Sequence, residues 1–314
     1  MDETAGLADE SGVFSTHEAM NAGLLPRDLS RLVSAGSILH VCRGWYAVAS
    51  LVLVDDHPAA RRRQLHAATA RALVRAFDGR AVASHHTGLV LHDLPIFGSD
   101  LSQVHLTRTG DDHSRRRRGL TVHEHVTGAA AQGGVIEPSV AVVQAGMVNG
   151  PMAALVAADA ALHRGLISDL DLAHAQSLIG GARALVVRRT LRHADGRSES
   201  PGETRLREGL RRMGFAVTPQ VEIRDGSFLA RVDMLLDDAP VIFEFDGFVK
   251  YGRTWAQHDV TAPADVVFAE KVREDQLRGL GYSVVRVIWS DLDAMDIVRR
   301  RAETAVAATR HHVA

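Results

Sequence analysis

Two carboxylates at the end of an apolar strand constrain this chain more than any other feature of its sequence. Residues 241–246 read VIFEFD, a run of strand-forming residues that ends in Glu244 and Asp246. Side chains alternate along a strand, so Val241 and Phe243 share one face while both acids project from the other. The run therefore predicts a strand whose polar face can hold one cation between two carboxylates.

The preceding run adds a third acid. Residues 228–236, FLARVDMLL, predict a partner strand. A hairpin closed by a two- or four-residue loop centred on Asp238-Ala239 puts Asp233 directly across from Glu244, with Cβ atoms about 5 Å apart. Opposed carboxylates destabilise a sheet unless a positive charge compensates them. Because Mg²⁺ and Mn²⁺ prefer oxygen ligands, we expect one of them to be held by Asp233, Glu244 and Asp246.

A helix on the N-terminal side of these strands can supply a fourth acid. Ser200 has the position of a helix cap, Pro201 fits the first turn, and Glu203 follows three residues after the cap. Leu206 and Leu210 form an apolar stripe in line with Glu203. Glu203 therefore either completes the cap or points at the strand acids.

Two cations follow the second strand. Lys250 comes four residues after Asp246, where it can clamp a phosphate or stabilise a transition state. Arg273 belongs to a helical pattern and lies in line with Leu277, which directs it toward the acids. Both cations can equally be ordinary ion-pair partners of the same carboxylates. The predicted catalytic set is Glu203, Asp233, Glu244, Asp246 and Lys250, with Arg273 in support.

The first 50 residues have the pattern of a small DNA-binding module. Ser15 followed by Glu18 is typical of a capping box that opens a short helix, and Pro26 suits the first turn of a second helix. Two strand-like runs follow, ILHV at 38–41 and WYAV at 45–48. Two helices followed by a hairpin predict a winged helix-turn-helix domain.

Four side chains of this module are predicted to contact DNA. Arg27, Ser30 and Arg31 lie on the outer face of the second helix, which would enter the major groove, and Arg43 at the hairpin tip would reach the phosphate backbone. The alternative is a small helical cap with ordinary solvent-facing arginines. Residues 1–50 hold three basic and six acidic side chains, a poor balance for tight phosphate binding.

The middle of the chain is rich in Ala, Leu, Val and Arg. Helical patterns at 59–78 and 151–163 flank strand-like pieces at 101–108 and 119–126. The four arginines at 115–118 indicate an exposed turn, either solvated or in contact with nucleic acid. His123 and His125 share a strand face and form a conceivable metal pair without a third ligand nearby. His85 and His86 are expected to cap or pack at a helix start.

Length and composition limit the number of domains, the kinds of metal site and the cellular location that we expect. A chain of 314 residues exceeds what one hydrophobic core usually serves, and we predict three domains at 1–55, 56–197 and 198–314. Cys42 is the only cysteine, which excludes an internal disulfide and a zinc-thiolate cluster. Residues 1–12 are acidic without an apolar core, and no run approaches the roughly 18 apolar residues of a membrane span. We therefore expect a cytoplasmic protein without membrane contact.

Beyond these patterns, the C-terminal motifs resemble a known family. SPGETRLREGL, PQVEIRDGSFLARVDMLL, VIFEFDGFVKYG and EKVREDQLRGLGYSVVRVIW are similar to the endonuclease-like domain of very-short-patch-repair (Vsr-type) enzymes, in the PD-(D/E)XK nuclease superfamily. The resemblance covers about residues 198–292. It implies a mixed sheet flanked by helices and divalent-metal hydrolysis of phosphodiesters. Carried over, the helix acid is Glu203, the central aspartate is Asp233, and Gln220 falls where relatives commonly have glutamine.

Two positions depart from that family's pattern. Asp246 stands where the superfamily has a lysine two residues after the strand acid, and Lys250 replaces the histidine of the D-G-x-x-H motif. A protonated lysine cannot ligate a metal. An inactive nuclease fold is therefore the alternative that the departures leave open.

The N-terminal and middle segments resemble a second family. The run through RGWYAV is similar to the winged-helix domain of abortive-infection type IV antitoxins (AbiEi), and SHHTGLVLHDLP and ALVAADAALHRGLIS resemble the region that accompanies it. This resemblance covers most of residues 10–190. It implies DNA binding, repression of the antitoxin's own operon, and a nucleotidyltransferase-type toxin as partner. The chain is thus expected to be an α+β and α/β multidomain, DNA-binding protein with an endonuclease-like C-terminal domain, or an antitoxin and autorepressor whose nuclease fold is inactive.

Overall fold

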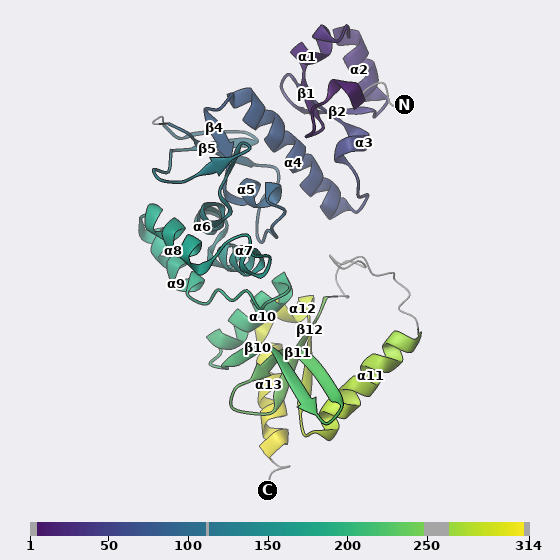
Figure 1. Cartoon of the computed structure of the whole chain (residues 1–314), viewed down its shortest axis with the longest axis vertical. Coiled ribbons are helices and arrows are strands. Elements are labelled where there is room, and N and C mark those ends of the chain that lie inside the picture. Colours follow the sequence, from purple (N-terminus) through teal and green to yellow (C-terminus); the bar gives the residue numbers. More distant parts are fainter. Residues whose placement is uncertain (1–4, 111–112, 248–263, 311–314) are drawn as a thin grey trace. The chain divides into compact units, whose positions relative to one another are not determined.

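The computed structural model describes residues 5–110, 113–247 and 264–310, with side chains of the last segment described from 271 (Figure 1). Its contacts divide the chain into two compact units, Met1–Ala194 and Asp195–Ala314. Both units mix helices and sheets, which confirms the predicted α/β multidomain class. None of the described helices is long and apolar enough to cross a membrane.

The N-terminal unit begins with two helices and a three-stranded sheet. After η1 (Ala5–Leu7) come β1 (Val13–Ser15), α1 (Thr16–Asn21), α2 (Pro26–Ser34), β2 (Ile38–Cys42) and β3 (Trp45–Val48). The predicted capping box is present, because the amide of Glu18 donates to Ser15 Oγ and Glu18 accepts from the amide of Ser15. The sheet order is β1-β3-β2, and Phe14, Leu29 and Ile38 lie in its core.

The long helix α4 holds this module against the rest of the unit. It spans Pro58–Phe77 and follows the short α3 (Ala49–Val52), and its Ala68 packs with Val13 and Val52. Near its end, Arg75 pairs with Asp9 and Glu18, donates to the carbonyl of Val13 and lies over the ring of Trp45. Two of the module's acids are therefore neutralised by a cation from outside it.

A six-stranded mixed sheet and five helices complete the unit. The strands are β4 (Ala81–Ala83), β5 (Val104–Arg108), β6 (Arg115–Arg117), β7 (Leu120–His123), β8 (Ala131–Gln132) and β9 (Val135–Ile136), in the order β6-β7-β5-β4-β9-β8. The helices are α5 (His85–Leu91), α6 (Pro138–Asn149), α7 (Pro151–His163), α8 (Asp169–Leu178) and α9 (Ala182–Leu191). α6 and α7 are apolar on nearly every side, as expected of helices inside a core.

The C-terminal unit is a four-stranded mixed sheet between helices. Its elements are α10 (Pro201–Arg212), β10 (Val217–Asp225), β11 (Phe228–Leu236), β12 (Val241–Asp246), α11 (Ala264–Gly279), β13 (Ser283–Ile288), α12 (Trp289–Leu292) and α13 (Met295–Arg310). The order is β10-β11-β12-β13, and among these described strands β12 and β13 run parallel while the other neighbours run antiparallel. α10, α12 and α13 pack on one face, and Leu277 of α11 packs on the other.

Candidate functional site

The β11–β12 hairpin has the register that the sequence predicts. Residues 237–240 form the loop, and the ladder pairs Met234 with Phe243 and Leu235 with Ile242. The ladder ends there, so Asp233 is not paired with Glu244 as predicted. Instead the backbone amide of Phe245 donates to Asp233 Oδ2 at 2.7 Å, and the carboxylate takes the place of a ladder carbonyl.

Strand pairing of β11 is interrupted at Asp233 toward β10 as well as toward β12. β10 pairs Pro219 with Met234 and Val221 with Val232, which leaves Gln220 and Asp233 unmatched. Gln220 has a left-handed backbone, φ +53°, rare for a residue with a side chain. Burial also changes face, because Met234 packs on the α10 side and Val232 on the α11 side. This irregularity lets side chains from both sides of the sheet approach Asp233.

The helix acid reaches the same place. Glu203 is 7% exposed, and its carboxylate accepts from Ser200 Oγ at 2.7 Å, from the amide of Glu199 at 2.9 Å and from Gln220 Nε2 at 3.0 Å. Glu203 therefore does both things that its position predicts: it completes the cap of α10 and faces the sheet. The contact with Gln220 ties the irregular residue of β10 to the helix.

Phe245 fixes the distance between α10 and the acidic strand. A side-chain carbon on Gly202 would lie inside van der Waals contact of the Phe245 ring, so only glycine permits this approach. The same ring meets Trp289 edge-on, with centroids 5.1 Å apart. Gly202 therefore allows the N-terminus of α10, and Glu203 with it, to lie close to β12.

Burial and the negative charges of nearby acids raise the pKa of Asp233. Burial, together with the negative charges of Glu244 and Glu203, raises the pKa of Asp233 to about 7, against the opposing hydrogen bond from Phe245. A carboxyl group with this pKa is partly protonated at neutral pH in the absence of a cation. The three acids thus share one electrostatic environment, and it favours the arrival of positive charge.

In this structure, Arg273 supplies part of that charge. Its guanidinium donates to Glu244 Oε1 at 3.0 Å and to the carbonyl of Arg231 at 2.8 Å. The predicted direction of Arg273, toward the acids, is confirmed, and it acts as an ion-pair partner. A metal bound by Glu244 would have to displace or share this arginine.

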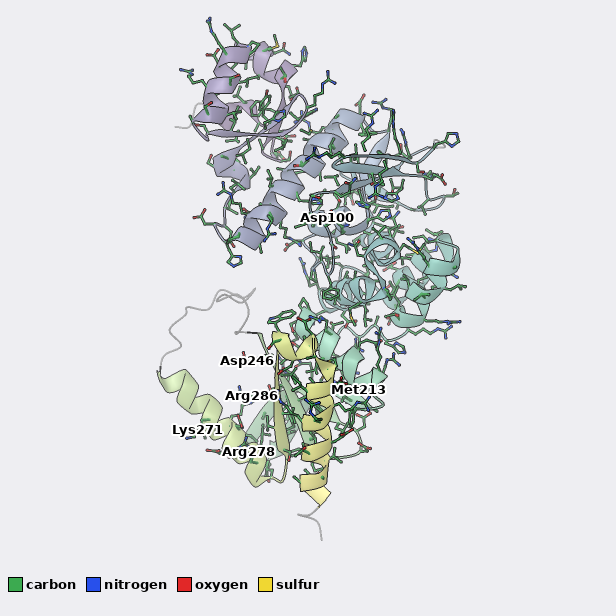
Figure 2. All side chains as sticks on the ribbon, turned by 180° about the vertical axis from the view of Figure 1, so that it is seen from behind. Asp100, Met213, Asp246, Lys271, Arg278 and Arg286 are labelled. Carbon is green, nitrogen blue, oxygen red and sulfur yellow. The ribbon has the colours of Figure 1, made fainter. Side chains whose placement is uncertain are left out.

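The two remaining residues of the predicted set are less defined. Asp246 ends β12, beside Ile288 of β13, and by alternation it shares a face with Glu244 (Figure 2). Lys250 lies outside the described residues.

Among the described residues, one set of three His, Cys, Asp or Glu has ligand atoms all within 4.8 Å of one another, and it is His85, His105 and His123. The carboxylates do not form such a set, so metal ligation by them would draw the acids together.

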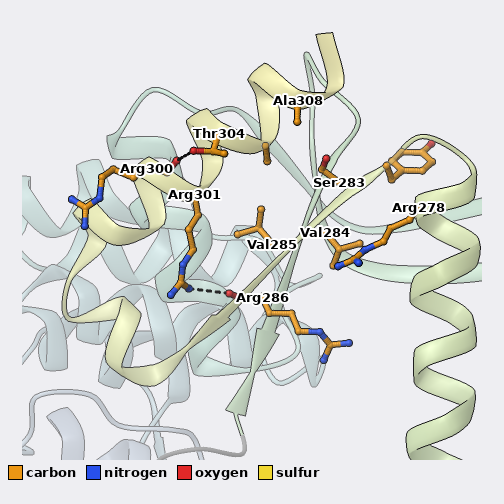
Figure 3. A pocket seen from close by; sticks show the side chains of 11 residues that line it. Arg278, Ser283, Val284, Val285, Arg286, Arg300, Arg301, Thr304 and Ala308 are labelled. Carbon is orange, nitrogen blue, oxygen red and sulfur yellow. Dashed lines mark hydrogen bonds between the residues drawn. The ribbon is translucent and has the colours of Figure 1, made fainter. Parts of the chain in front are cut away.

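A hollow along β13 is a second polar feature of this unit. It lies between α11 and α13, at the edge of the sheet (Figure 3). Arg278 and Arg286 both pair with Glu274, at 2.5 and 2.9 Å, and Arg301 pairs with Asp291 at 2.8 Å. Two acids, Glu274 and Asp291, thus pair with three of the four arginines that line the hollow, and it holds none of the predicted site residues.

The four predicted DNA-contacting residues are exposed. Arg27, Ser30 and Arg31 lie on α2, and Arg43 lies in the turn between β2 and β3. Ser30 Oγ donates to the carbonyl of Pro26 in its own helix. Arg31 is 3.6 Å from Asp28, a weak pair at a solvent-facing site. The side chains of α2 and of the hairpin tip are therefore available to a ligand.

Two features of the N-terminal unit were not predicted from sequence. The arginines predicted to lie on a turn form β6 instead, an exposed edge strand, with Arg115, Arg116 and Arg117 paired to β7. His125 does not share a strand with His123, because β7 ends at His123, and His125 Nδ1 lies 3.1 Å from the carbonyl of Arg108. The prediction that His123 and His125 share a strand face is therefore wrong, and His123 lies beside His85 and His105 instead.

Comparison with known proteins identifies one segment. Residues 6–49 match a family described as transcriptional regulator, AbiEi antitoxin. The matched segment contains β1, both helices and the β2–β3 hairpin, and all four predicted DNA-contacting residues. No curated protein matches the chain. The N-terminal module is thus similar to an antitoxin regulator domain, as the sequence predicts.

Proposed function

We propose that this protein binds DNA through an N-terminal winged-helix module and hydrolyses phosphodiester bonds in its C-terminal unit, with Mg²⁺ or Mn²⁺. The observation that carries the enzymatic half is the convergence of Glu203, Asp233 and Glu244 from α10, β11 and β12, with a pKa of about 7 at Asp233. Carboxylates that raise one another's pKa are typical of sites that hold a divalent cation. The arrangement also supports the resemblance to PD-(D/E)XK, Vsr-type nucleases.

Each residue has a role in this reaction. Asp233, Glu244 and Asp246 would hold the ion, which supplies an activated water and neutralises charge on the phosphate. Glu203, held by Gln220 and Ser200, would position the water. Arg273 would turn from Glu244 to the phosphate when the ion binds, and Lys250 would stabilise the negative charge of the transition state.

The DNA-binding half rests on the N-terminal module. Its match to an AbiEi antitoxin regulator, and the exposure of Arg27, Arg31 and Arg43, support an interaction with duplex DNA. Residues 1–50 carry more acidic than basic side chains, but two of the acids, Asp9 and Glu18, are neutralised by ion pairs with Arg75. The exposed arginines of β6 offer a further basic surface in the same unit.

The second candidate function is an antitoxin that represses its own operon and retains the nuclease fold as a scaffold. Its cognate partner would be a nucleotidyltransferase-type toxin. The ion pair between Arg273 and Glu244 favours this alternative, because a cation already compensates the acid. Asp246, at the superfamily's lysine position, favours it as well.

A cleavage assay separates the two candidates. The purified protein is incubated with plasmid and with single-stranded DNA, in Mg²⁺, in Mn²⁺ and in EDTA. The nuclease proposal predicts metal-dependent cutting that falls at least about 100-fold in Asp233→Ala and stays unchanged in Asp238→Ala, a control in the exposed β11–β12 loop. Absence of cutting with either metal, or equal cutting by Asp233→Ala, would leave the antitoxin proposal.

DNA binding is tested on the fragment upstream of the protein's own gene. Arg27→Ala with Arg31→Ala should weaken binding at least about tenfold and reduce its salt dependence. Arg224→Ala, an exposed arginine of β10 that pairs with Glu222, is the matched control. Specific binding that persists after deletion of residues 1–50 would refute the assignment of the N-terminal module.

A further inference from the structure

Five histidines gather inside the N-terminal unit, a number that packing alone does not require. His85 and His123 stack with ring centroids 3.8 Å apart, and His105 lies 5.0 Å from His123 and 4.6 Å from His86. His66 adjoins His86 at 5.6 Å. They come from α4, α5, β5 and β7, so the chain brings together distant segments to form the group.

Two of the five are structural. His66 has Nδ1 against the carbonyl of Leu101 at 2.9 Å and Nε2 against Thr87 Oγ1 at 3.0 Å. His86 has Nδ1 against Asn149 Oδ1 at 3.3 Å and Nε2 against the carbonyl of Gln103 at 3.0 Å. With both ring nitrogens engaged, neither can ligate an ion.

The other three histidines are different. The described contacts engage one nitrogen of each: His85 Nδ1 lies 2.9 Å from Ser84 Oγ, and His105 Nδ1 lies 2.9 Å from His123 Nε2. Each offers a ring nitrogen such that the three nitrogens all lie within 4.8 Å of one another. In a tetrahedral zinc site, nitrogens about 2.0–2.1 Å from the ion are about 3.3 Å apart. One ion can therefore bind all three nitrogens after side-chain rotations that draw them together.

The strand register explains why these three residues meet. β5 and β7 run parallel, and His105 pairs with Thr121. His123, two residues further, projects from the same face of the sheet as Thr121 and His105. His85 begins α5 with a left-handed backbone, φ +54°, and its amide donates to Gln144 Oε1. A backbone held in such a conformation is common where a side chain must be aimed at a site.

The surroundings suit a neutral imidazole that donates a lone pair. His85 is 5% and His105 is 6% exposed. Burial lowers the pKa of His105 to about 3 and that of His123 to about 4, and it lowers the pKa of His85 as well. Ser84 Oγ against His85 Nδ1 is the kind of outer contact that orients a metal-binding ring.

We propose that His85, His105 and His123 form a three-histidine site for a borderline transition-metal ion, Zn²⁺ first among them. Imidazole nitrogens select Zn²⁺, Ni²⁺ or Cu²⁺ over Mg²⁺, so this site would differ in metal from the carboxylates of the C-terminal unit. The stacked rings of His85 and His123 cannot both aim at one ion, so binding turns one of them. The ion would replace the His105–His123 hydrogen bond and join α5, β5 and β7.

The test uses the full-length protein, first stripped of metal. After equilibration with Zn²⁺ and removal of excess ion, we expect one tightly held zinc per chain in the wild type. X-ray absorption at the zinc edge should show three imidazole nitrogens at about 2.0 Å. Asp233→Asn should retain this zinc, since its substitution lies in the other unit.

Variants give the matched comparison. His123→Asn, at the partly exposed ligand, should lower Zn²⁺ affinity at least about 100-fold, whereas His174→Asn, at an exposed position of α8, should leave it unchanged. If His123→Asn fails to fold, the absorption spectrum of the wild type decides. No tightly held zinc, a spectrum dominated by oxygen ligands, or equal affinity in His123→Asn would overturn the proposal.

Discussion

Asp233→Asn should stabilise the metal-free C-terminal unit, and more so as the pH rises. Asparagine keeps an oxygen that can accept from the amide of Phe245 and removes a carboxyl group whose ionisation is unfavourable in the fold. The pKa of Asp233 is raised from 3.8 to about 7 by burial and by the charges of Glu244 and Glu203. The folded protein therefore holds the Asp233 proton more tightly than the unfolded chain does.

The sign and size follow from linkage. The contribution of Asp233 to the free energy of unfolding is fully present below pH 3.8 and decreases as the pH rises toward 7. Above pH 7 the loss stays constant. At about 1.36 kcal/mol for each pH unit between the two pKa values, the wild type loses about 4 to 5 kcal/mol at pH 8 and about 1 to 2 kcal/mol at pH 5. The advantage of Asp233→Asn should thus grow by about 3 kcal/mol between pH 5 and pH 8.

Hydrogen exchange of residues 228–236 in EDTA confines the measurement to the C-terminal unit, with wild type and variant compared at the same pH. Asp238→Asn, in the exposed loop of the hairpin, controls for the loss of one negative charge. Adding Mn²⁺ should narrow the difference at pH 8, because the ion stabilises only the protein with the carboxylate. An advantage that is equal at both pH values, or a destabilised variant, would refute the assigned electrostatics.

Three further predictions concern the supports of the site. Gly202→Ala should destabilise the unit by about 1–3 kcal/mol through overlap with Phe245, whereas Gly279→Ala, with open space around it, should not; urea unfolding of each variant tests this. Gln220→Gly relieves the strain of the left-handed backbone but removes the hydrogen bond to Glu203, so the free energy of unfolding should change by less than about 1 kcal/mol. Any metal-dependent cleavage should fall at least about tenfold, because Glu203 loses this support. Arg75→Ala should destabilise the N-terminal module by about 1–2 kcal/mol, seen as faster exchange of residues 13–21; unchanged exchange would contradict it.

Strong local patterns made much of the C-terminal unit predictable. The two alternating strands and the four-residue loop between them fix the hairpin register, and the cap at Ser200 marks the start of α10. The interruption at Asp233 was not predictable from the same signals. It depends on the positive φ of Gln220, and the sequence around Gln220 has no glycine to indicate such a backbone.

The histidine group was missed for a different reason. A parallel pair such as β5 and β7 is joined by a long connection, so its register cannot be read from a turn as a hairpin's can. His85 also lies in a helix rather than a strand. Two-residue spacing suggested His125 as the partner of His123, but β7 ends before His125.

The central claim is that Asp233 and Glu244 hold a divalent cation, and locating Mn²⁺ by its anomalous scattering in soaked crystals tests it most directly. We predict a peak between the carboxylates of Asp233 and Glu244, with Arg273 moved off Glu244. A map without a peak there, with Arg273 still on Glu244, would contradict the claim.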